Sequence, residues 1–155
     1  MRKTLEAISL GALAVLIWST YRALTGPNHL PDKIPTHFNL AGQPDGWGTP
    51  AMLLALPALA VALYLLITVV ARFPSCFNYP VRVTAGNRGR LEPLALGMIA
   101  WLKTEVVCLF AWIQISTIEA AWRGLGGLPP ALIPVSLVAI FATVDWYIAA
   151  MRRVA

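Results

Sequence analysis

The stretch "AMLLALPALAVALYLLITVVA", residues 51–71, decides the fold class because it is apolar throughout and carries no charged residue. About 20 such residues, rising 1.5 Å each, cross the ~30 Å hydrocarbon layer of a bilayer. Pro50 stands just before the run, where a helix tolerates a missing N–H. Pro57 lies deeper and predicts a kink. The stretch therefore predicts a membrane-spanning helix.

Three more apolar runs flank this helix, over approximately residues 5–24, 93–122 and 130–151. The first follows "MRK" and predicts an uncleaved helix, because no small-residue cleavage site follows it. The run over 93–122 exceeds the bilayer thickness and must tilt or protrude. "RGLGGLPP", residues 123–130, predicts a tight turn before the last run. We expect one all-α integral membrane domain, a four-helix bundle over residues 1–155.

The composition also indicates a membrane protein. The 155 residues are 58% hydrophobic and 12% charged, whereas soluble domains carry about 25% charged residues. The formal charge is +5, but the charges gather at the ends of apolar runs, so the expected partner is the lipid bilayer and no nucleic acid. Cys76 and Cys108 lack a CxxC spacing and are predicted to be free thiols. No metal framework and no cofactor motif is present, so we expect no cofactor and no metal.

The positive charges predict an orientation. Arginine or lysine residues stand before the first run, in the second connection and at the C-terminus, at Arg2, Lys3, Arg72, Arg82, Arg88, Arg90, Arg152 and Arg153. The first and third connections hold few lysine or arginine residues. The positive-inside rule then places the N- and C-termini and the second connection in the cytoplasm of a multi-pass protein, and residues 30–48 outside.

The first connection holds "LPDKIPTHFNLAGQPDGWG", residues 30–48. Its prolines restrict the backbone, so it is expected to be ordered. "QPDGWG" predicts a turn at Asp45–Gly46, and "FNLAGQ" offers another. Trp47 suits the level of the lipid headgroups. Thr49 is expected to cap the second span.

Four side chains in this loop are candidates for ligand binding: His37, Asn39, Asp45 and Trp47. One interpretation is a recognition surface for a peptide, a headgroup or a small molecule. Another is that His37 and Asp45 bond the backbone of the loop itself, as polar side chains in turns commonly do. A metal site of His29, His37 and Asp45 is a third, weaker interpretation, since the spacing fits no standard pattern.

The same stretch resembles the signature of a bacterial membrane domain of unknown function, number sixteen forty-eight, found at the N-terminus of SdpI-type immunity proteins. The matching positions are Leu30, Pro31, Ile34, Pro35, His37, Phe38, Asn39, Gly42, Pro44, Asp45, Trp47 and Gly48. "NYPVRVTAGNRGRL", residues 78–91, resembles the second connection of that family. The resemblance implies a short stand-alone member in the bacterial inner membrane, related to proteins that act in immunity or capture a partner.

Three ionisable residues lie at membrane depth, where each costs ~2.5–3.5 kcal/mol on insertion scales and seeks a partner. Lys103 and Asp145 lie at similar predicted depths on neighbouring antiparallel helices, so we expect them to pair. Glu105 lies about 200° round the helix from Lys103 and is expected to face another helix or to stay protonated. The three form either a structural ion pair or a polar pocket and ion path.

No nucleophile and base stand in a recognisable pattern, so no catalytic residue is assigned. The favoured function is that of a non-enzymatic membrane protein of the immunity or sensor type, whose outer loop recognises a peptide or envelope ligand. The alternatives are a small transporter or accessory subunit of a larger membrane complex, in which the chain could be a homo-oligomer, and a membrane enzyme using His37 and Asp45.

Overall fold

The computed structural model describes residues 1–39, 41–124 and 127–154 of the chain. The elements are, in order, α1 (Arg2–Thr25), β1 (Ile34–Phe38), β2 (Pro44–Gly48), η1 (Pro50–Leu54), α2 (Ala55–Val70), η2 (Pro74–Cys76), α3 (Arg88–Arg123) and α4 (Leu132–Arg153).

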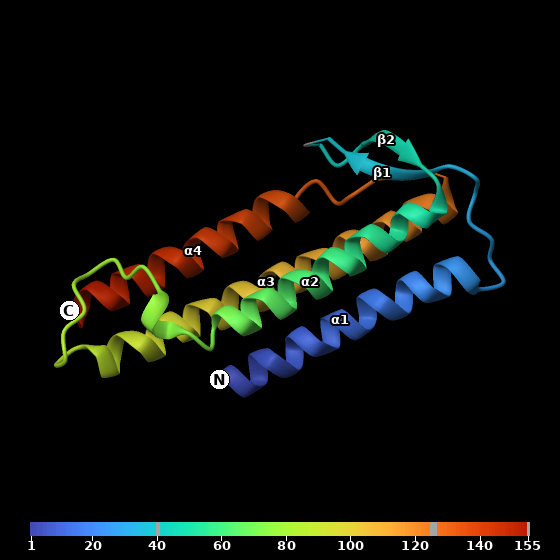
Figure 1. Cartoon of the computed structure of the whole chain (residues 1–155). Coiled ribbons are helices and arrows are strands. Elements are labelled where there is room, and N and C mark those ends of the chain that lie inside the picture. The colour runs from blue at the N-terminus through green and yellow to red at the C-terminus, as the bar shows by residue number, and fades with distance from the viewer. Residues whose placement is uncertain (40, 125–126, 155) are drawn as a thin grey trace.

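Within the described residues, four helical segments are long and apolar enough to cross a membrane, namely α1, the continuous η1–α2 segment, α3 and α4. The four helices run side by side as a bundle, and a hairpin of β1 and β2 lies at one end (Figure 1). The integral membrane four-helix fold predicted from hydropathy is confirmed. Leu125 and Gly126, within the predicted turn before α4, lie outside the described residues.

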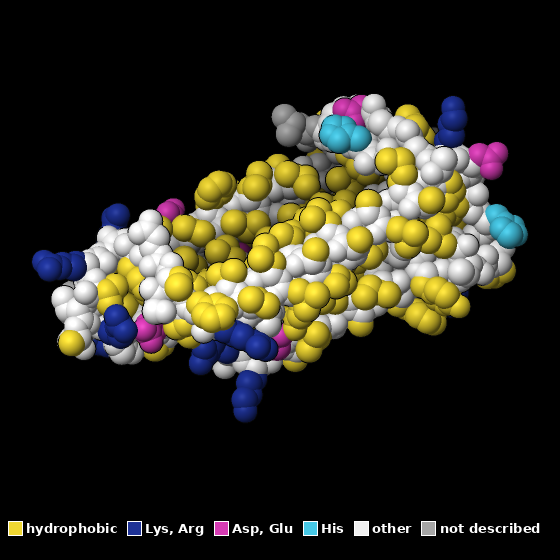
Figure 2. All heavy atoms as spheres, in the orientation of Figure 1, with side chains coloured by type: hydrophobic (Ala, Val, Ile, Leu, Met, Phe, Trp, Pro, Cys, Tyr) yellow, Lys and Arg dark blue, Asp and Glu magenta, His cyan; other side chains and the backbone are white. Residues whose placement is uncertain are grey.

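Both chain ends and the connection from α2 to α3 lie at the end of the bundle opposite the hairpin (Figure 1). Figure 2 shows that Lys and Arg side chains gather mainly at this end. The fold therefore separates the charges as the sequence pattern requires, with a basic end and a hairpin end.

The central element is α3, which contacts each of the other three helices. Its 36 residues correspond to about 54 Å at 1.5 Å per residue, so α3 extends beyond a ~30 Å hydrocarbon layer. In the middle of the bundle, small residues let α1, α2 and α3 approach. Ala60 and Ala111 pack there against Leu13, Leu16 and Val107.

The second span begins differently from the expected kinked helix. Pro50 starts the short 3₁₀ helix η1, and α2 follows from Ala55, which places Pro57 in the first turn of α2. The change from 3₁₀ to α-helix thus falls just before Pro57. Thr49 precedes η1, but no capping bond of its side chain is present among the described residues; only its carbonyl accepts from the N–H of Met52.

Pro57 leaves a carbonyl without its helical donor, because the N–H four residues after Leu53 would be that of residue 57. Gln114 of α3 replaces it. Its Nε2 donates to the carbonyl of Leu53 at 2.9 Å and to Oγ1 of Thr20 at 2.7 Å. Gln114 is buried, so one side chain joins α1, η1 and α3 inside the bundle.

Hydroxyl groups join α1 and α3 nearer the basic end. The hydroxyl oxygens of Ser9 and Thr104 lie 2.9 Å apart, and each also lies within hydrogen-bonding distance of a carbonyl of its own helix. Since each hydroxyl has one proton, one of the two donates to the other, which in turn donates to a carbonyl. Both residues are buried. Small hydroxyl residues of this kind let helices approach closely in lipid and hold them there.

We predict that Gln114→Ala lowers the stability of the folded bundle by about 2 kcal/mol, because it leaves the Leu53 carbonyl buried and unpaired. Thermal unfolding in nanodiscs measures the change as a lower melting temperature. Gln43→Ala, at an exposed glutamine of the hairpin, is the matched control and should melt like the unmodified protein. Equal melting of the two variants would contradict the prediction.

Candidate functional site

The hairpin is fixed to the bundle by one deeply buried side chain. Ile34 of β1 is 0% exposed and packs in a cluster with Ala23 of α1, Leu53 of η1, and Ile118 and Ala121 of α3. Elements from three helical segments thus surround a single strand residue. The loop predicted to be ordered is a β-hairpin seated on the helix ends.

The turn of the hairpin lies at residues 39–43, so the predicted turn at Asp45–Gly46 is wrong and the alternative in "FNLAGQ" applies. Leu40, within that stretch, is not described. The register pairs Ile34 with Gly48 and Phe38 with Pro44, which places Asp45 inside β2. Asn39 closes the turn, because its side-chain Oδ1 accepts the N–H groups of Ala41 at 2.9 Å and Gln43 at 3.0 Å.

Gly42 holds the hairpin tip against the connection between α3 and α4. Its φ is +77°, which favours glycine, and its carbonyl accepts the N–H of Leu128 at 2.8 Å. A Cβ on Gly42 would collide with the Leu128 carbonyl, and one on Gly127 would collide with the Gly42 carbonyl. Both glycines are required by this close backbone contact.

The remaining strand glycines also have a packing role. A Cβ on Gly46 would lie 2.8 Å from the Cβ of His37, and one on Gly48 would meet Thr36 and Met52. Ile34, Asn39, Gly42, Gly46 and Gly48 are thus accounted for by the fold. Asn39, predicted as a ligand-binding residue, is used by the turn.

His37, Asp45 and Trp47 are different, because all three side chains are exposed. The side chains of His37 and Asp45 are 73% and 44% exposed, and Trp47 is 60% exposed. Nδ1 of His37 lies 2.5 Å from Oδ1 of Asp45, and since a carboxylate only accepts, the imidazole N–H is the donor. Asp45 and Trp47 are two apart on β2 and therefore share a face. Figure 2 shows histidine and acidic side chains at the hairpin end.

The side chains of His37 and Asp45 bond each other on the surface, and in the described part of the loop neither bonds the backbone. Recognition of a ligand by these residues stays a prediction. Among the described residues, no three His, Cys, Asp or Glu side chains are placed to hold a metal ion. The metal site of His29, His37 and Asp45, the weaker interpretation, is therefore not formed by the described residues. Cys76 and Cys108 are free, as predicted.

The predicted pair of Lys103 with Asp145 is wrong. Nζ of Lys103 donates to Oε2 of Glu6 at 2.6 Å and to Oγ1 of Thr68 at 3.1 Å. It also lies 4.5 Å from the ring centroid of Tyr64, whose hydroxyl donates to Glu6. The side chain of Lys103 is 7% exposed. The ammonium group thus joins α1, α2 and α3, and α4 takes no part.

Asp145 is exposed on α4, which explains why it cannot reach a lysine buried between α1 and α2. Glu105 faces α4, as expected of a residue that points to another helix, and its Oε1 accepts the hydroxyl of Thr143 at 2.6 Å. Lys103, Glu105 and Asp145 therefore point in three directions and do not form one pocket or path.

The connection from α2 to α3 is also ordered at the basic end. Asn87 accepts the N–H of Thr84 at 2.7 Å and donates to the carbonyl of Arg82 at 3.0 Å. Tyr79 packs against the cluster formed by α3 and α4, and its hydroxyl donates to the Pro74 carbonyl at 3.0 Å. Burial raises the pKa of the Tyr79 phenol above its ordinary value, so the phenol remains a donor.

Part of the chain matches a known protein family. Residues 9–61 match the model of a domain of unknown function, DUF1648. The DUF1648 match runs from α1 through the hairpin into α2 and confirms the resemblance carried by the hairpin sequence. It includes His37, Asp45 and Trp47 but neither α3 nor α4.

A curated relative from Archaeoglobus fulgidus, described as an uncharacterized protein, is 40% identical to this chain over 86 residues. The alignment covers 50% of this chain and 45% of the relative, so the chain spans about half the length of the curated relative that it matches. No solved structure matches the chain.

Sequence reasoning missed Glu6, Tyr64 and Thr68 as partners of Lys103. Glu6 lies in the first turns of α1, close to Arg2 and Lys3. Its position near the start of the first span indicates a carboxylate near the membrane surface, within reach of a cation on another helix. Tyr64 and Thr68 are four apart, so they share one face of α2. The spacing of Tyr64 and Thr68 can be read from the sequence, but their contact with Lys103 depends on how α2 packs on α3.

We predict that Lys103→Met destabilises the protein by about 1 kcal/mol, because Glu6, whose side chain is 40% exposed, loses its cation. Adding Glu6→Gln should recover part of this loss, since the two residues act as a pair. Asp145→Asn in the same Lys103→Met background is the control and should recover nothing. Melting temperatures of the three variants in nanodiscs measure the effect, and recovery by Asp145→Asn alone would restore the original pairing hypothesis.

Proposed function

We propose that this protein is a non-enzymatic recognition protein of the immunity or sensor type, and that its hairpin binds a peptide or an envelope ligand outside the cytoplasm. The observation that carries the proposal is the exposed group of His37, Asp45 and Trp47. The fold uses Ile34, Asn39 and the glycines of the hairpin for packing or for its turn. These three are fixed in place and remain available to a ligand.

The chemistry of the group fits a peptide with a basic and an apolar side chain. Asp45 keeps carboxylate oxygen available to a cation beside its bond to His37. Trp47 offers a rigid apolar surface with a polar N–H, and such residues dominate recognition surfaces. The buried anchor Ile34 holds the strand, so binding orders little that is not already ordered.

The proposed orientation places the hairpin outside and the basic end in the cytoplasm. Lysine and arginine residues favour the cytoplasmic side, and they gather opposite the hairpin (Figure 2). A ligand of the hairpin would then come from the cell envelope or beyond it. The related SdpI-type role, protection against an external peptide, is consistent with this direction.

We predict that a membrane-impermeant maleimide labels Ala41→Cys in intact cells, in a Cys76→Ser background. The native Cys76 is exposed in the connection at the basic end, so in the unmodified chain it should react only after the cells are made permeable. Cys108 lies in α3 and is part-buried, which limits its labelling. Labelling of Cys76 in intact cells, with none at position 41, would reverse the orientation.

We predict that a photo-cross-linking amino acid at Gln43 captures a discrete peptide or envelope component in native membranes. Gln43 is exposed, directly precedes β2 and is two residues from Asp45 in the chain. His37→Ala and Asp45→Ala should each reduce the captured product about tenfold, the effect of losing a charge-assisted hydrogen bond. Mass spectrometry of the product measures it.

The controls are His29→Ala and Asp32→Ala, which remove the same residue types from the exposed segment before β1. These variants should capture as much product as the unmodified chain. Failure to capture any product, or an equal loss in control and hairpin variants, would contradict the proposed recognition by His37 and Asp45.

A further inference from the structure

The interface between α3 and α4 has two different halves. Toward the basic end the helices pack closely, because a Cβ at Gly97 would lie 2.9 Å from the hydroxyl oxygen of Tyr147. Tyr147 also packs there with Leu91, Ala95 and Met151. Nearer the middle of the bundle the contact opens, and cavities lie between the two helices. Figure 2 shows a hollow lined mainly by hydrophobic side chains beside α4.

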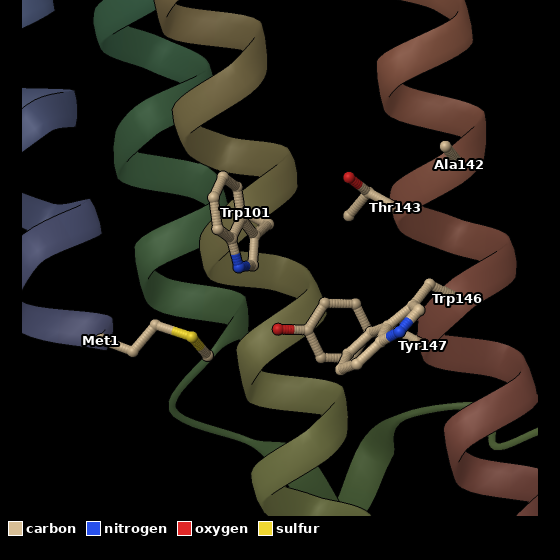
Figure 3. A pocket seen from close by; sticks show the side chains of 6 residues that line it. All are labelled: Met1, Trp101, Ala142, Thr143, Trp146 and Tyr147. Carbon is tan, nitrogen blue, oxygen red and sulfur yellow. The ribbon is translucent and has the colours of Figure 1, made fainter.

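The first cavity lies on the basic side of Thr143 and is apolar. It has a volume of about 460 Å³, and Trp101 of α3 faces Trp146 and Tyr147 of α4 across it (Figure 3). Thr143 lines the same space. The hydroxyl of Thr143 is committed to Glu105 at 2.6 Å, so this hydrogen bond marks the boundary of the first cavity.

The second cavity lies on the other side of that hydrogen bond. It has a volume of about 200 Å³ and includes Glu105, Leu109 and Trp112 of α3. These positions are spaced by four and three residues and therefore form one face of the helix. Ser136 and Ile140 of α4, also four apart, form the opposite wall. A single acid thus stands in a small, otherwise mainly apolar space.

Only one of the two carboxyl oxygens of Glu105 has a hydrogen-bond partner among the described residues. Its Oε1 accepts from Thr143, whereas its buried Oε2 has no hydrogen-bond partner among the described residues. Buried carboxylate oxygens are costly to leave unpaired, and acids at membrane depth normally face a partner or a substrate. Lys103, two residues away, is bonded to Glu6 on the other side of α3.

We propose that the cavity at Glu105 is a binding site for a lipophilic ammonium ion that enters from the surrounding lipid. An ammonium N–H donates to Oε2 and its charge balances the carboxylate. Trp112 adds an aromatic wall, which attracts cations. Leu109 and Ile140 contact the first carbons of the alkyl chain, and the rest of the chain stays in the lipid. This site is independent of the hairpin.

Dodecylammonium is a suitable probe because it joins an N–H donor to an alkyl chain. We expect saturable binding of radiolabelled dodecylammonium to the protein in nanodiscs, above the partition into empty nanodiscs. Glu105→Gln should weaken this binding at least tenfold. Thr143→Val should weaken it a few-fold, because the hydroxyl positions the carboxylate.

Asp145→Asn is the matched control, since it removes the acid of α4, which is exposed and does not line the cavity. It should bind dodecylammonium as the unmodified protein does. Dodecanol, which lacks the charge, should not compete. Retained binding by Glu105→Gln, equal loss in Asp145→Asn, or competition by dodecanol would each overturn the proposal.

A second measurement needs no variant and therefore does not depend on the folding of Glu105→Gln. Dicyclohexylcarbodiimide modifies carboxyl groups in apolar surroundings, and mass spectrometry locates the modified residue. Dodecylammonium should slow the modification of Glu105 and leave that of Asp145 unchanged. Unchanged modification of Glu105 at saturating dodecylammonium would overturn the proposal.

Discussion

The structure depends on one constraint: a polar group that enters the hydrocarbon layer needs a partner inside the protein. Apolar side chains alone do not order helices in lipid, because the lipid is as apolar as they are. Polar contacts therefore add to the close packing of α1, α2 and α3 around Ala60 and Ala111. Gln114 bonds the carbonyl of Leu53, Ser9 lies against Thr104, and Lys103 bonds Glu6. These contacts fix how each helix is rotated toward its neighbours.

Hydropathy was sufficient to predict the four spans, because crossing a bilayer is a property of each segment taken separately. Pairing is not such a property. Lys103 and Asp145 lie at similar depths, but depth leaves the rotation of each helix undetermined, and Asp145 turns outward. The partner of Lys103 is Glu6, because α1 packs on α3 and brings the two side chains together. The prediction failed where it needed information from two helices at once.

The hairpin shows the same limit on a smaller scale. The sequence indicated order through its prolines and glycines, and two possible turns were evident. The strand register and the contact of Gly42 with Leu128, residues far apart in the chain, distinguish them. Once the packing roles of Asn39 and the glycines are known, the side chains without such a role stand out. His37, Asp45 and Trp47 were predicted as candidates, but the contact of His37 with Asp45 across the two strands is set by the pairing of the hairpin.

The residues on which the hairpin packs extend beyond the segment that matches DUF1648. The DUF1648 match ends at residue 61, yet Ile34 is buried against Ile118, and the Gly42 carbonyl is paired with Leu128. Two of the contacts that shape the hairpin thus come from sequence beyond the matched segment. The limits of the sequence match are therefore not the limits of the packing in this chain. In a protein that joins the matched segment to different helices, those helices must supply an equivalent surface for the strand and an equivalent donor for the turn.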